Sequence, residues 1–285
     1  MLGADRADRR ARGQGPRGRG RGGRHRAQRG RRPLIDIHCH ILPGLDDGPR
    51  DEAGSIALAR AAVAAGTRTI VATPHIRGDY PFPHERIEER AGELRGIFAR
   101  EEIELELLTG GEIALSELDL IDDAHLRDLA LGAGHYVLVE SPYGDVTEML
   151  EGMLFELQTR GFQPVLGHPE RCPAFLSDFE RLTRLVRAGI LCSVTAASME
   201  GRFGRKIRRF TAELFREGFV HDVASDAHAA GGRGPALTGG FEAVGGALRD
   251  QAAWYTQEAP YAMVTGRSIP ARPPLPEGRG LFRRR

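Results

Sequence analysis

The stretch IDIHCHILPGLDDG, residues 35–48, combines a β-type apolar run with side chains that ligate metals. Side chains of a strand alternate with period two, so His38 and His40 project from one side and can share an ion. One aspartate of the closing DDG triplet is expected to be a further ligand, with Asp47 preferred and Asp46 as the alternative. The triplet is also typical of a turn in which Asp caps a helix.

Apolar β-type runs alternate with helical patterns along the rest of the chain. The seven strand candidates are residues 34–38, 69–73, 103–110, 136–140, 164–168, 190–196 and 219–226. Segments such as 52–66 and 179–189 place apolar residues at helical spacing and end at glycine, which is typical of a helix C-cap. This alternation predicts parallel strands in a barrel or a doubly wound sheet, and periodicity alone does not separate the two.

The placement of polar side chains favours the barrel. Candidate ligands stand at or just past the carboxyl ends of six predicted strands: His38, His40, His75, Glu112, Glu140, His168, Asp226 and His228. In an α/β barrel these ends meet on one face, where barrel enzymes build their active sites. Other histidines lie off this pattern and are expected to be surface or packing residues: His84, His125, His135 and His221.

This ligand set exceeds what one ion needs, so we expect two or three divalent metal ions. Imidazole and carboxylate without thiolate suit manganese, iron or zinc. Such ions supply hydroxide near neutral pH and hold both the attacking and the leaving oxygen of a phosphate ester. Each residue also has an ordinary structural interpretation, and Glu112 and Glu140 could be loop or cap carboxylates. The constellation as a whole favours metal binding.

Two arginines next to the ligand motifs complete a phosphate site. Arg171 stands in HPER and Arg233 follows SDAH, and guanidinium groups bind phosphate oxygens in a bidentate manner. The alternatives are that Arg171 pairs with Glu170 or Asp178, and that Arg233 is a solvated loop residue. The predicted reaction is hydrolysis of a phosphate monoester.

The cysteines exclude a second phosphatase mechanism. A cysteine-nucleophile phosphatase needs arginine six residues after its cysteine, and no arginine follows Cys39, Cys172 or Cys192 at that spacing. Three widely spaced cysteines also predict neither a disulfide framework nor a thiolate metal site. No apolar run is long enough for a membrane helix or a signal peptide. We therefore expect a soluble cytoplasmic protein.

The two ends of the chain differ from its body. Residues 1–33 carry twelve Arg against two Asp, about +10 of a net charge of +1, which leaves the remainder near −9. This Arg/Gly-rich arm is expected to be disordered, and binding to nucleic acid or to an anionic membrane is the alternative. Residues 34–266 are expected to form the catalytic domain and 267–285 a flexible Pro/Arg-rich tail.

The ordered motifs resemble the polymerase-and-histidinol-phosphatase (PHP) superfamily. Within it they are most similar to bacterial manganese-dependent protein-tyrosine phosphatases of capsule and exopolysaccharide gene clusters. The resemblance covers about residues 34–266 and rests on IDIHCHILPGLDDG, GTRTIVATPH, GGEI, YVLVESP, PVLGHPER, FGRKIRRF and VASDAH. The arginine-rich arm has no counterpart in that pattern.

This resemblance implies a distorted seven-stranded (β/α)7 barrel with a trinuclear, manganese-type site. His38, His40, Glu112 and Asp226 would hold one metal; Glu112, Glu140 and His168 the second; Asp47, His75 and His228 the third. Arg171 and Arg233 would bind phosphate. The implied substrate is a phosphotyrosine protein, typically the tail of a bacterial tyrosine autokinase, and family members differ in assembly, so a homo-oligomer is compatible with it.

We therefore predict a metal-dependent protein-tyrosine phosphatase in which a bridging hydroxide attacks phosphorus. One rival is another phosphoesterase on the same site, such as a histidinol-phosphate phosphatase. The second rival is a noncatalytic binding module that has kept the fold.

Overall fold

The computed structural model describes residues 33–144, 149–244 and 246–274. Its strands are β1 (Leu34–Cys39), β2 (Thr67–Ala72), β3 (His75–Ile76), β4 (Glu106–Thr109), β5 (Glu112–Ile113), β6 (Tyr136–Glu140), β7 (Gln163–Gly167), β8 (Leu191–Thr195) and β9 (Asp222–Ala224). Its longer helices are α1 (Glu52–Ala64), α2 (Glu85–Arg100), α4 (Met149–Thr159), α6 (Phe179–Arg187) and α8 (Arg205–Glu217). Shorter helices are α3 (Asp123–Asp128), α5 (Pro173–Ser177), α7 (Ala196–Glu200), α9 (Gly239–Val244), α10 (Gly246–Asp250) and α11 (Ala259–Val264). Two 3-10 helices are η1 (Leu115–Leu120) and η2 (Pro169–Arg171), and η3 (Trp254–Glu258) is a π-helix.

The strands form two parallel sheets. One sheet has the order β1-β2-β4 and the other the order β3-β5-β6-β7-β8-β9. All strand pairs are parallel, with registers such as Ile70 beside Leu107 and Leu138 beside Val165. The expectation of a parallel α/β architecture is therefore confirmed.

The expected closed barrel is not confirmed, because the described strands make no closed sheet. Thr73–Pro74 separates β2 from β3 and Gly110–Gly111 separates β4 from β5, so a short strand that was not predicted follows each of the expected runs 69–73 and 103–110. Pro74 has no N–H to donate, and the hydrogen-bond ladder changes partners there. At the remaining edges of the two sheets, β1 is linked to the segment after β9 only by an isolated parallel bridge between Cys39 and Ala227.

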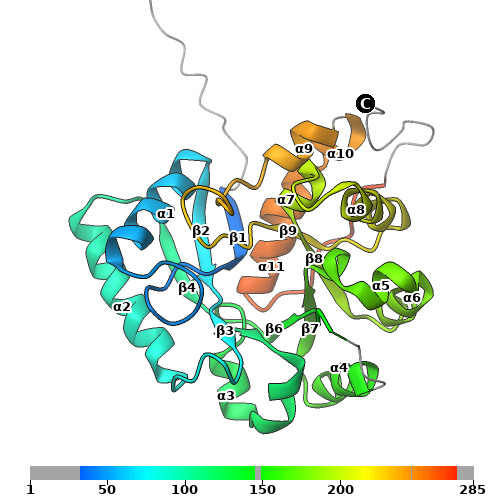
Figure 1. Ribbon diagram of the computed structural model, residues 1–285, viewed down its shortest axis with the longest axis horizontal. Coiled ribbons are helices and arrows are strands. Elements are labelled where there is room, and N and C mark those ends of the chain that lie inside the picture. The colour runs from blue at the N-terminus through cyan, green and yellow to red at the C-terminus, as the bar shows by residue number, and fades with distance from the viewer. Residues whose placement is uncertain (1–32, 145–148, 245, 275–285) are drawn as a thin grey trace, which may run out of the picture. The chain divides into compact units, whose positions relative to one another are not determined.

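Local sequence signals set the helix ends. Asp51 caps α1 by accepting a hydrogen bond from the Gly54 N–H at 2.9 Å, and Asp178 caps α6. Gly189 and Gly218, just past α6 and α8, have φ of +91° and +76°, a conformation that favours glycine. Figure 1 shows the helices flanking the strands, with α1 and α2 beside β1, β2 and β4.

Two hydrophobic clusters fill the body. The larger packs helices on strands and contains Leu58 of α1, Leu94 of α2 and Phe215 of α8. The smaller is formed by strand side chains together with Met263 and Val264 of α11. The strands are thus covered by apolar side chains along most of their length, and the polar ligands collect at their carboxyl ends.

The expected arm, 1–33, lies outside the described residues except for Pro33. The expected tail is described as far as residue 274, and hydrogen bonds tie this part to the body. The Trp254 indole donates to the Pro270 carbonyl at 3.2 Å and the Gln251 amide to the Pro274 carbonyl at 2.8 Å. No helix of the described part is both long and apolar enough to cross a membrane.

His221 is a packing histidine that predicts acid sensitivity of the fold. Its Nδ1 accepts the Cys192 N–H at 3.1 Å. Burial, with the nearby Arg272 charge, lowers the His221 pKa from 6.5 to about 4. Between these two pH values His221 binds a proton in the unfolded chain but not in the native protein. Protonation therefore stabilises the unfolded state, and the free energy of unfolding decreases as the pH falls.

We predict that lowering the pH from 7 to 5 reduces the free energy of unfolding of the wild type by about 2 kcal/mol more than that of His221→Gln. Urea unfolding at both pH values measures this difference. The control is His125→Gln, which removes a histidine whose side chain is 47% exposed. Equal pH dependence of the wild type and His221→Gln would contradict the assignment.

Candidate metal centre

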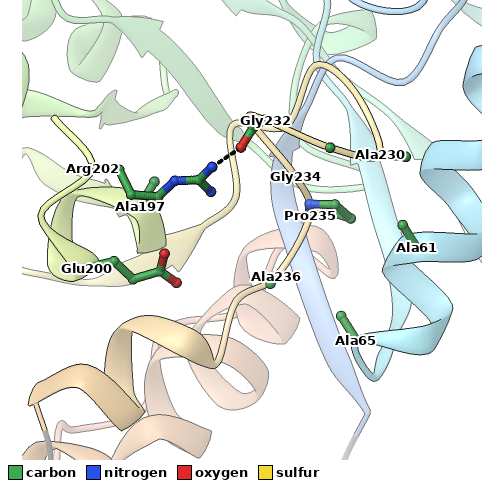
Figure 2. Close-up of a pocket in the computed structure, with 11 residues that line it drawn as sticks. Ala61, Ala65, Ala197, Glu200, Arg202, Ala230, Gly232, Gly234, Pro235 and Ala236 are labelled. Atoms are coloured by element: carbon green, nitrogen blue, oxygen red, sulfur yellow. Dashed lines mark hydrogen bonds between the residues drawn. The ribbon is translucent and has the colours of Figure 1, made fainter.

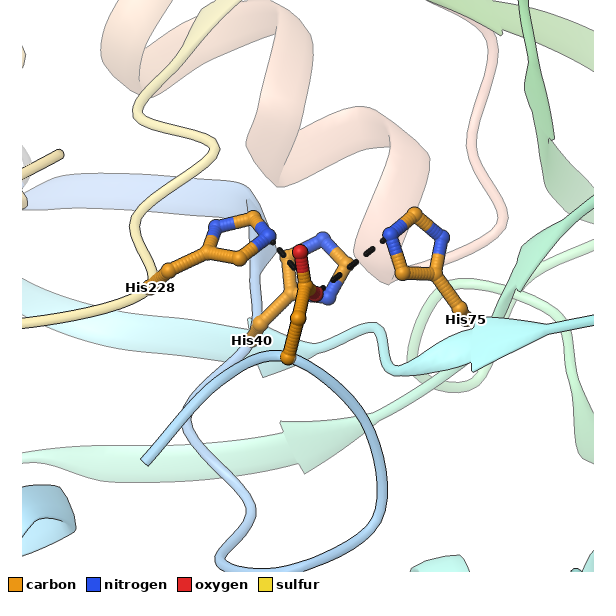
Figure 3. Close-up of side chains that lie close together, drawn as sticks. His40, His75 and His228 are labelled. Atoms are coloured by element: carbon orange, nitrogen blue, oxygen red, sulfur yellow. Dashed lines mark ion pairs between the residues drawn. The ribbon is translucent and has the colours of Figure 1, made fainter. Parts of the chain in front are cut away.

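The structure brings all nine predicted ligands together at the carboxyl ends of the strands. Their ligand atoms form four groups, each with its members within 4.8 Å of one another: His40, Asp47, His75 and His228; His38, Glu112 and His168; His38, His40 and Asp226; His75, Glu112 and Glu140. Figure 3 shows the rings of His40, His75 and His228 converging from separate segments. Eight of the nine residues are buried, and Asp47 is the exposed one.

The Glu112 carboxylate lies at the centre of this cluster. Its Oε2 is 3.0 Å from His75 Nδ1, 3.2 Å from His38 Nε2 and 3.3 Å from His40 Nε2, and its Oε1 is 2.8 Å from His168 Nε2. Glu112 is the first residue of β5, and the Gly110–Gly111 break places it just beyond the carboxyl end of β4. One buried carboxylate is thus shared among four imidazoles.

Asp226 links the histidines to both predicted phosphate-site arginines. Its Oδ1 lies 3.5 Å from His38 Nε2 and from His40 Nε2. Its Oδ2 accepts hydrogen bonds from Arg233, at 2.7 Å, and from Arg171. The expected alternative, Arg171 paired with Glu170 or Asp178, is therefore not what the structure shows.

Two ligand candidates have strained backbones. His168 and Asp226 have φ of +39° and +52°, in the left-handed region that non-glycine residues rarely adopt. Such a conformation costs about 1–3 kcal/mol and persists where the surroundings impose it, most often at functional sites. Here the His168 N–H donates to the Ser193 carbonyl at 2.8 Å and the Asp226 N–H to the His38 carbonyl at 2.8 Å.

A buried carboxylate supports the turn that carries Arg171. Glu170 Oε1 accepts hydrogen bonds from the Thr195 N–H at 3.0 Å, from the Thr195 hydroxyl at 3.0 Å and from the Ser198 hydroxyl at 2.7 Å. This network fixes η2 against the end of β8. Within the HPER motif, Glu170 positions the turn, and the neighbouring guanidinium reaches the cluster.

Electrostatics keep the central carboxylates ionised. Burial pushes the pKa of Asp226 up, but His38, His40 and Arg171 push it down further, to well below its ordinary value. The Glu112 pKa is likewise held well below its ordinary value, because the histidine contacts outweigh burial. Ionised carboxylates are the form that binds a cation.

The two aspartates of DDG face different partners. Asp46 Oδ2 lies 2.6 Å from His40 Nδ1 and accepts the His75 N–H at 3.0 Å. Asp47 Oδ1 faces the cluster, 3.0 Å from His228 Nε2, and this contact is the main reason that the Asp47 pKa falls to about 2. Asp47 therefore lies in a group that could hold a metal ion, and Asp46 contacts His40 from behind, as carboxylates do in carboxylate–histidine–metal arrangements.

Glycine is required at the third position of DDG. A Cβ on Gly48 would collide with the His40 carbonyl oxygen. The Gly48 N–H also donates to Asp46 Oδ1 at 2.9 Å. The close approach of these two segments fixes the loop that carries both aspartates.

Sequence reasoning missed Arg77. Its NH1 lies 3.4 Å from Glu140 Oε1, and its other guanidinium nitrogens bind Asp79 at 2.6–2.7 Å. Arg77 follows His75 by two residues, so strand alternation was the available signal. A third arginine therefore borders the cluster on the Glu140 side.

Two tyrosines at the rim were also missed. The Tyr80 ring stacks on His75 with centroids 5.6 Å apart, and the Tyr143 ring stacks on His168 at 5.5 Å. Tyr143 is 51% exposed. Both tyrosines follow strand ends in loops, where no periodic pattern marks them. They give the site two aromatic walls.

The donor set fits divalent metal ions. Several buried atoms of the cluster make no well-oriented hydrogen bond among the described residues: Glu112 Oε2, His75 Nδ1, His168 Nδ1 and His228 Nε2. Two of these atoms, Glu112 Oε2 and His75 Nδ1, lie 3.0 Å apart without that orientation, as ligands of one ion would. Buried polar atoms are normally paired, and ionised carboxylates are costly to bury without a counter-charge. Mixed imidazole and carboxylate ligands suit manganese, iron or zinc alike.

The grouping differs from the three sets that the resemblance implied. Glu140 lies with His75 and Glu112, whereas His168 lies with His38 and Glu112. The group around Asp47 also includes His40. The off-pattern histidines His84 and His125 make an edge-to-face contact with each other, with ring centroids 5.5 Å apart, and belong to none of these groups.

Comparison with known proteins assigns the chain to a family. A family model described as capsular polysaccharide synthesis, CpsB/CapC, matches residues 34–253. The chain belongs to this family. The tyrosine-protein phosphatase YwqE of Bacillus subtilis (strain 168) is 40% identical over 196 residues, which are 68% of this chain and 77% of YwqE. The tyrosine-protein phosphatase CpsB of Streptococcus pneumoniae is 30% identical over 218 residues, 74% of this chain and 89% of CpsB.

Solved structures agree. A chain from the crystal structures of YwqE from Bacillus subtilis and CpsB from Streptococcus pneumoniae, described as unique metal-dependent tyrosine phosphatases, matches with a TM-score of 0.76 and 35% identity. The match covers 86% of this chain and 100% of that chain. A β-aspartyl dipeptidase from Fervidobacterium islandicum AW-1 shares the fold alone, with a TM-score of 0.56 and 17% identity. The resemblance read from the motifs is thus confirmed.

We predict that Asp46→Ala weakens metal binding about 10- to 100-fold, because His40 loses the partner that orients it. Competition with a chelator, using Mn²⁺, measures the affinity. Asp119→Ala, at an exposed position away from the ligand groups, is the matched control. Unchanged affinity in Asp46→Ala would show that this aspartate has no role at the centre.

Proposed function

We propose that this protein is a metal-dependent protein-tyrosine phosphatase. The observation that carries the proposal is that nine ligand-type side chains form four adjoining groups, and that two arginines both contact one of these side chains, Asp226. The relatives that match most of the chain are named tyrosine-protein phosphatases, which agrees with this chemistry.

The ligand groups would hold two or three divalent ions, and manganese is our choice for the native metal. The proposed ligands are His38, His40, Asp47, His75, Glu112, Glu140, His168, Asp226 and His228. Bound ions of this kind acidify water and offset charge on phosphoryl oxygens, so that a phosphate ester is hydrolysed near neutral pH.

Arg171 and Arg233 are proposed to bind the phosphoryl group. Both guanidinium groups converge on Asp226 Oδ2 from different segments. Each has five donors, so contact with one carboxylate oxygen leaves several N–H groups for phosphate oxygens. They would stabilise the charge that develops in the transition state, in a mostly buried setting where such contacts are strong.

The rim favours an aromatic ester over a small aliphatic one. Tyr80 and Tyr143 stack on two of the ligand histidines, on different ligand groups. Aromatic rings prefer offset or edge contacts with one another at centroid distances of about 4.5–7 Å. A phosphotyrosine ring entering between these walls would find such contacts, whereas a phosphoserine would not.

We propose a bacterial tyrosine autokinase tail of the capsule or exopolysaccharide pathway as the substrate. The family description names capsular polysaccharide synthesis, and the exposed rim suits a protein chain. A cytoplasmic location belongs to the same proposal.

We predict that Arg171→Ala retains metal and loses about a hundred- to a thousandfold in kcat on a phosphotyrosine peptide, the usual effect of removing one charge-stabilising donor. Metal analysis and steady-state kinetics measure the two properties. The control is Arg160→Ala, which breaks the ion pair with Asp123 away from the site. Normal turnover in Arg171→Ala would place the phosphate site elsewhere.

A further inference from the structure

A strip of basic residues leads away from the proposed phosphate site. This basic strip comprises Arg202, Arg205, Lys206, Arg208 and Arg209, on the loop before α8 and on its first turns. No acidic residue occurs between positions 201 and 212. All five side chains are exposed except that of Arg208, which is half-buried. Part of the strip is the FGRKIRRF motif, to which the proposed function assigns no role.

The strip is unpaired, unlike other arginine-rich surfaces of this chain. On α2, Arg90 pairs with Glu93 at 2.7 Å and Arg95 with Glu88 at 2.5 Å. Among the residues that the structure describes, no ion pair includes the strip residues of α8. The strip therefore differs from α2, where Arg86, Arg90 and Arg95 each pair with a glutamate.

The position of the strip on α8 is electrostatically unfavourable in the free protein. Arg205 and Lys206 occupy the first turn, where the helix dipole is positive and acidic residues are preferred. Arg205 also has like charges three and four residues later, a spacing that destabilises a helix. An anionic partner would relieve both repulsions at once.

The strip is continuous with the catalytic arginines. Arg202 donates a hydrogen bond to the carbonyl of Gly232, the neighbour of Arg233, and crosses the edge of a pocket of about 330 Å³ (Figure 2). The Phe203 ring lies 4.9 Å from the guanidinium carbon of Arg171. Arg202 and its neighbour Phe203 thus contact both arginine-bearing segments, and α8 begins two residues later, at Arg205.

We propose that the basic strip binds an acidic segment adjacent to the phosphotyrosine in the same substrate chain. The inference rests on the proposed function and extends it to substrate selection. Carboxylates flanking the phosphotyrosine would pair with side chains of α8 while the phosphoryl group lies at Arg171 and Arg233. A peptide is favoured over a membrane or a nucleic acid because the strip begins at the site where a substrate side chain must enter.

The kinetic test compares phosphotyrosine peptides with three Glu or three Gln on either side, using the metal-loaded enzyme at low salt. We expect kcat/KM to be about tenfold higher for an acidic flank, mainly through KM, as several exposed ion pairs combine. The advantage should shrink as added salt screens these pairs. Arg205→Gln/Lys206→Gln/Arg209→Gln should abolish it and leave turnover of p-nitrophenyl phosphate unchanged.

The matched control is Arg86→Gln/Arg90→Gln/Arg100→Gln on α2, which removes the same charge and should keep the acidic preference. If phosphotyrosine peptides are hydrolysed without any preference for acidic flanks, the proposed role of the basic strip is wrong, and the proposed function is unaffected. Loss of binding to anionic lipid vesicles in the α8 variant, with the peptide preference unchanged, would also overturn it in favour of a membrane.

A binding test works even without turnover, because Lys206 is the only lysine in the sequence. A carbodiimide joins a carboxylate to a nearby amine as an amide, so an acidic phosphopeptide bound to the strip should be crosslinked to Lys206. The Gln-flanked peptide should not be. Mass spectrometry locates the link, and crosslinking only at the N-terminal amine would contradict the proposal.

Discussion

The Asp226 carboxylate is the contact on which the arrangement of the site depends. One oxygen faces His38 and His40 at the end of β1, and the other accepts Arg171 and Arg233. A buried carboxylate with cations or imidazoles on every side keeps its charge, and its backbone is held in a left-handed conformation to reach them. The segment after β9 therefore connects the metal ligands to the groups proposed to bind phosphate, and neither set is positioned independently of the other.

The same region also joins the two sheets. Pro74 interrupts the ladder on one side, and the Cys39–Ala227 bridge makes the contact on the other, both at carboxyl ends of strands. Irregular backbone at these positions turns ligand side chains toward a common centre, which continuous strands with strict alternation would not do. The breaks in the sheet and the cluster of candidate ligands therefore occupy the same region, between the apolar core and the loops.

Much of this could be predicted from the sequence, because its signals are local or periodic. Histidines were predicted at strand ends from three motifs: HCH after an apolar run, SDAH and HPER. Because the strands were predicted to be parallel, these histidines were expected to converge. The sheet break was hidden, since Pro74 and Gly110–Gly111 alter hydrogen bonding between strands distant in sequence. Arg77 and Tyr143 were missed because their partners Glu140 and His168 come from other segments, and Tyr80 because it lies in a loop without periodic pattern. The separate roles of Asp46 and Asp47 depend on a loop conformation set by the approach of Gly48 to His40.

The central claim is that this cluster, once loaded with metal, hydrolyses phosphotyrosine. The most direct measurement is a titration of metal-free protein with Mn²⁺, following bound metal and kcat/KM on a phosphotyrosine peptide, with histidinol phosphate and a phosphoserine peptide alongside. The account predicts no turnover without metal, and selective phosphotyrosine hydrolysis as two or three ions bind. Three results would contradict this account: full activity of the metal-free protein, a preference for histidinol phosphate, or a protein that is saturated with Mn²⁺ but inactive.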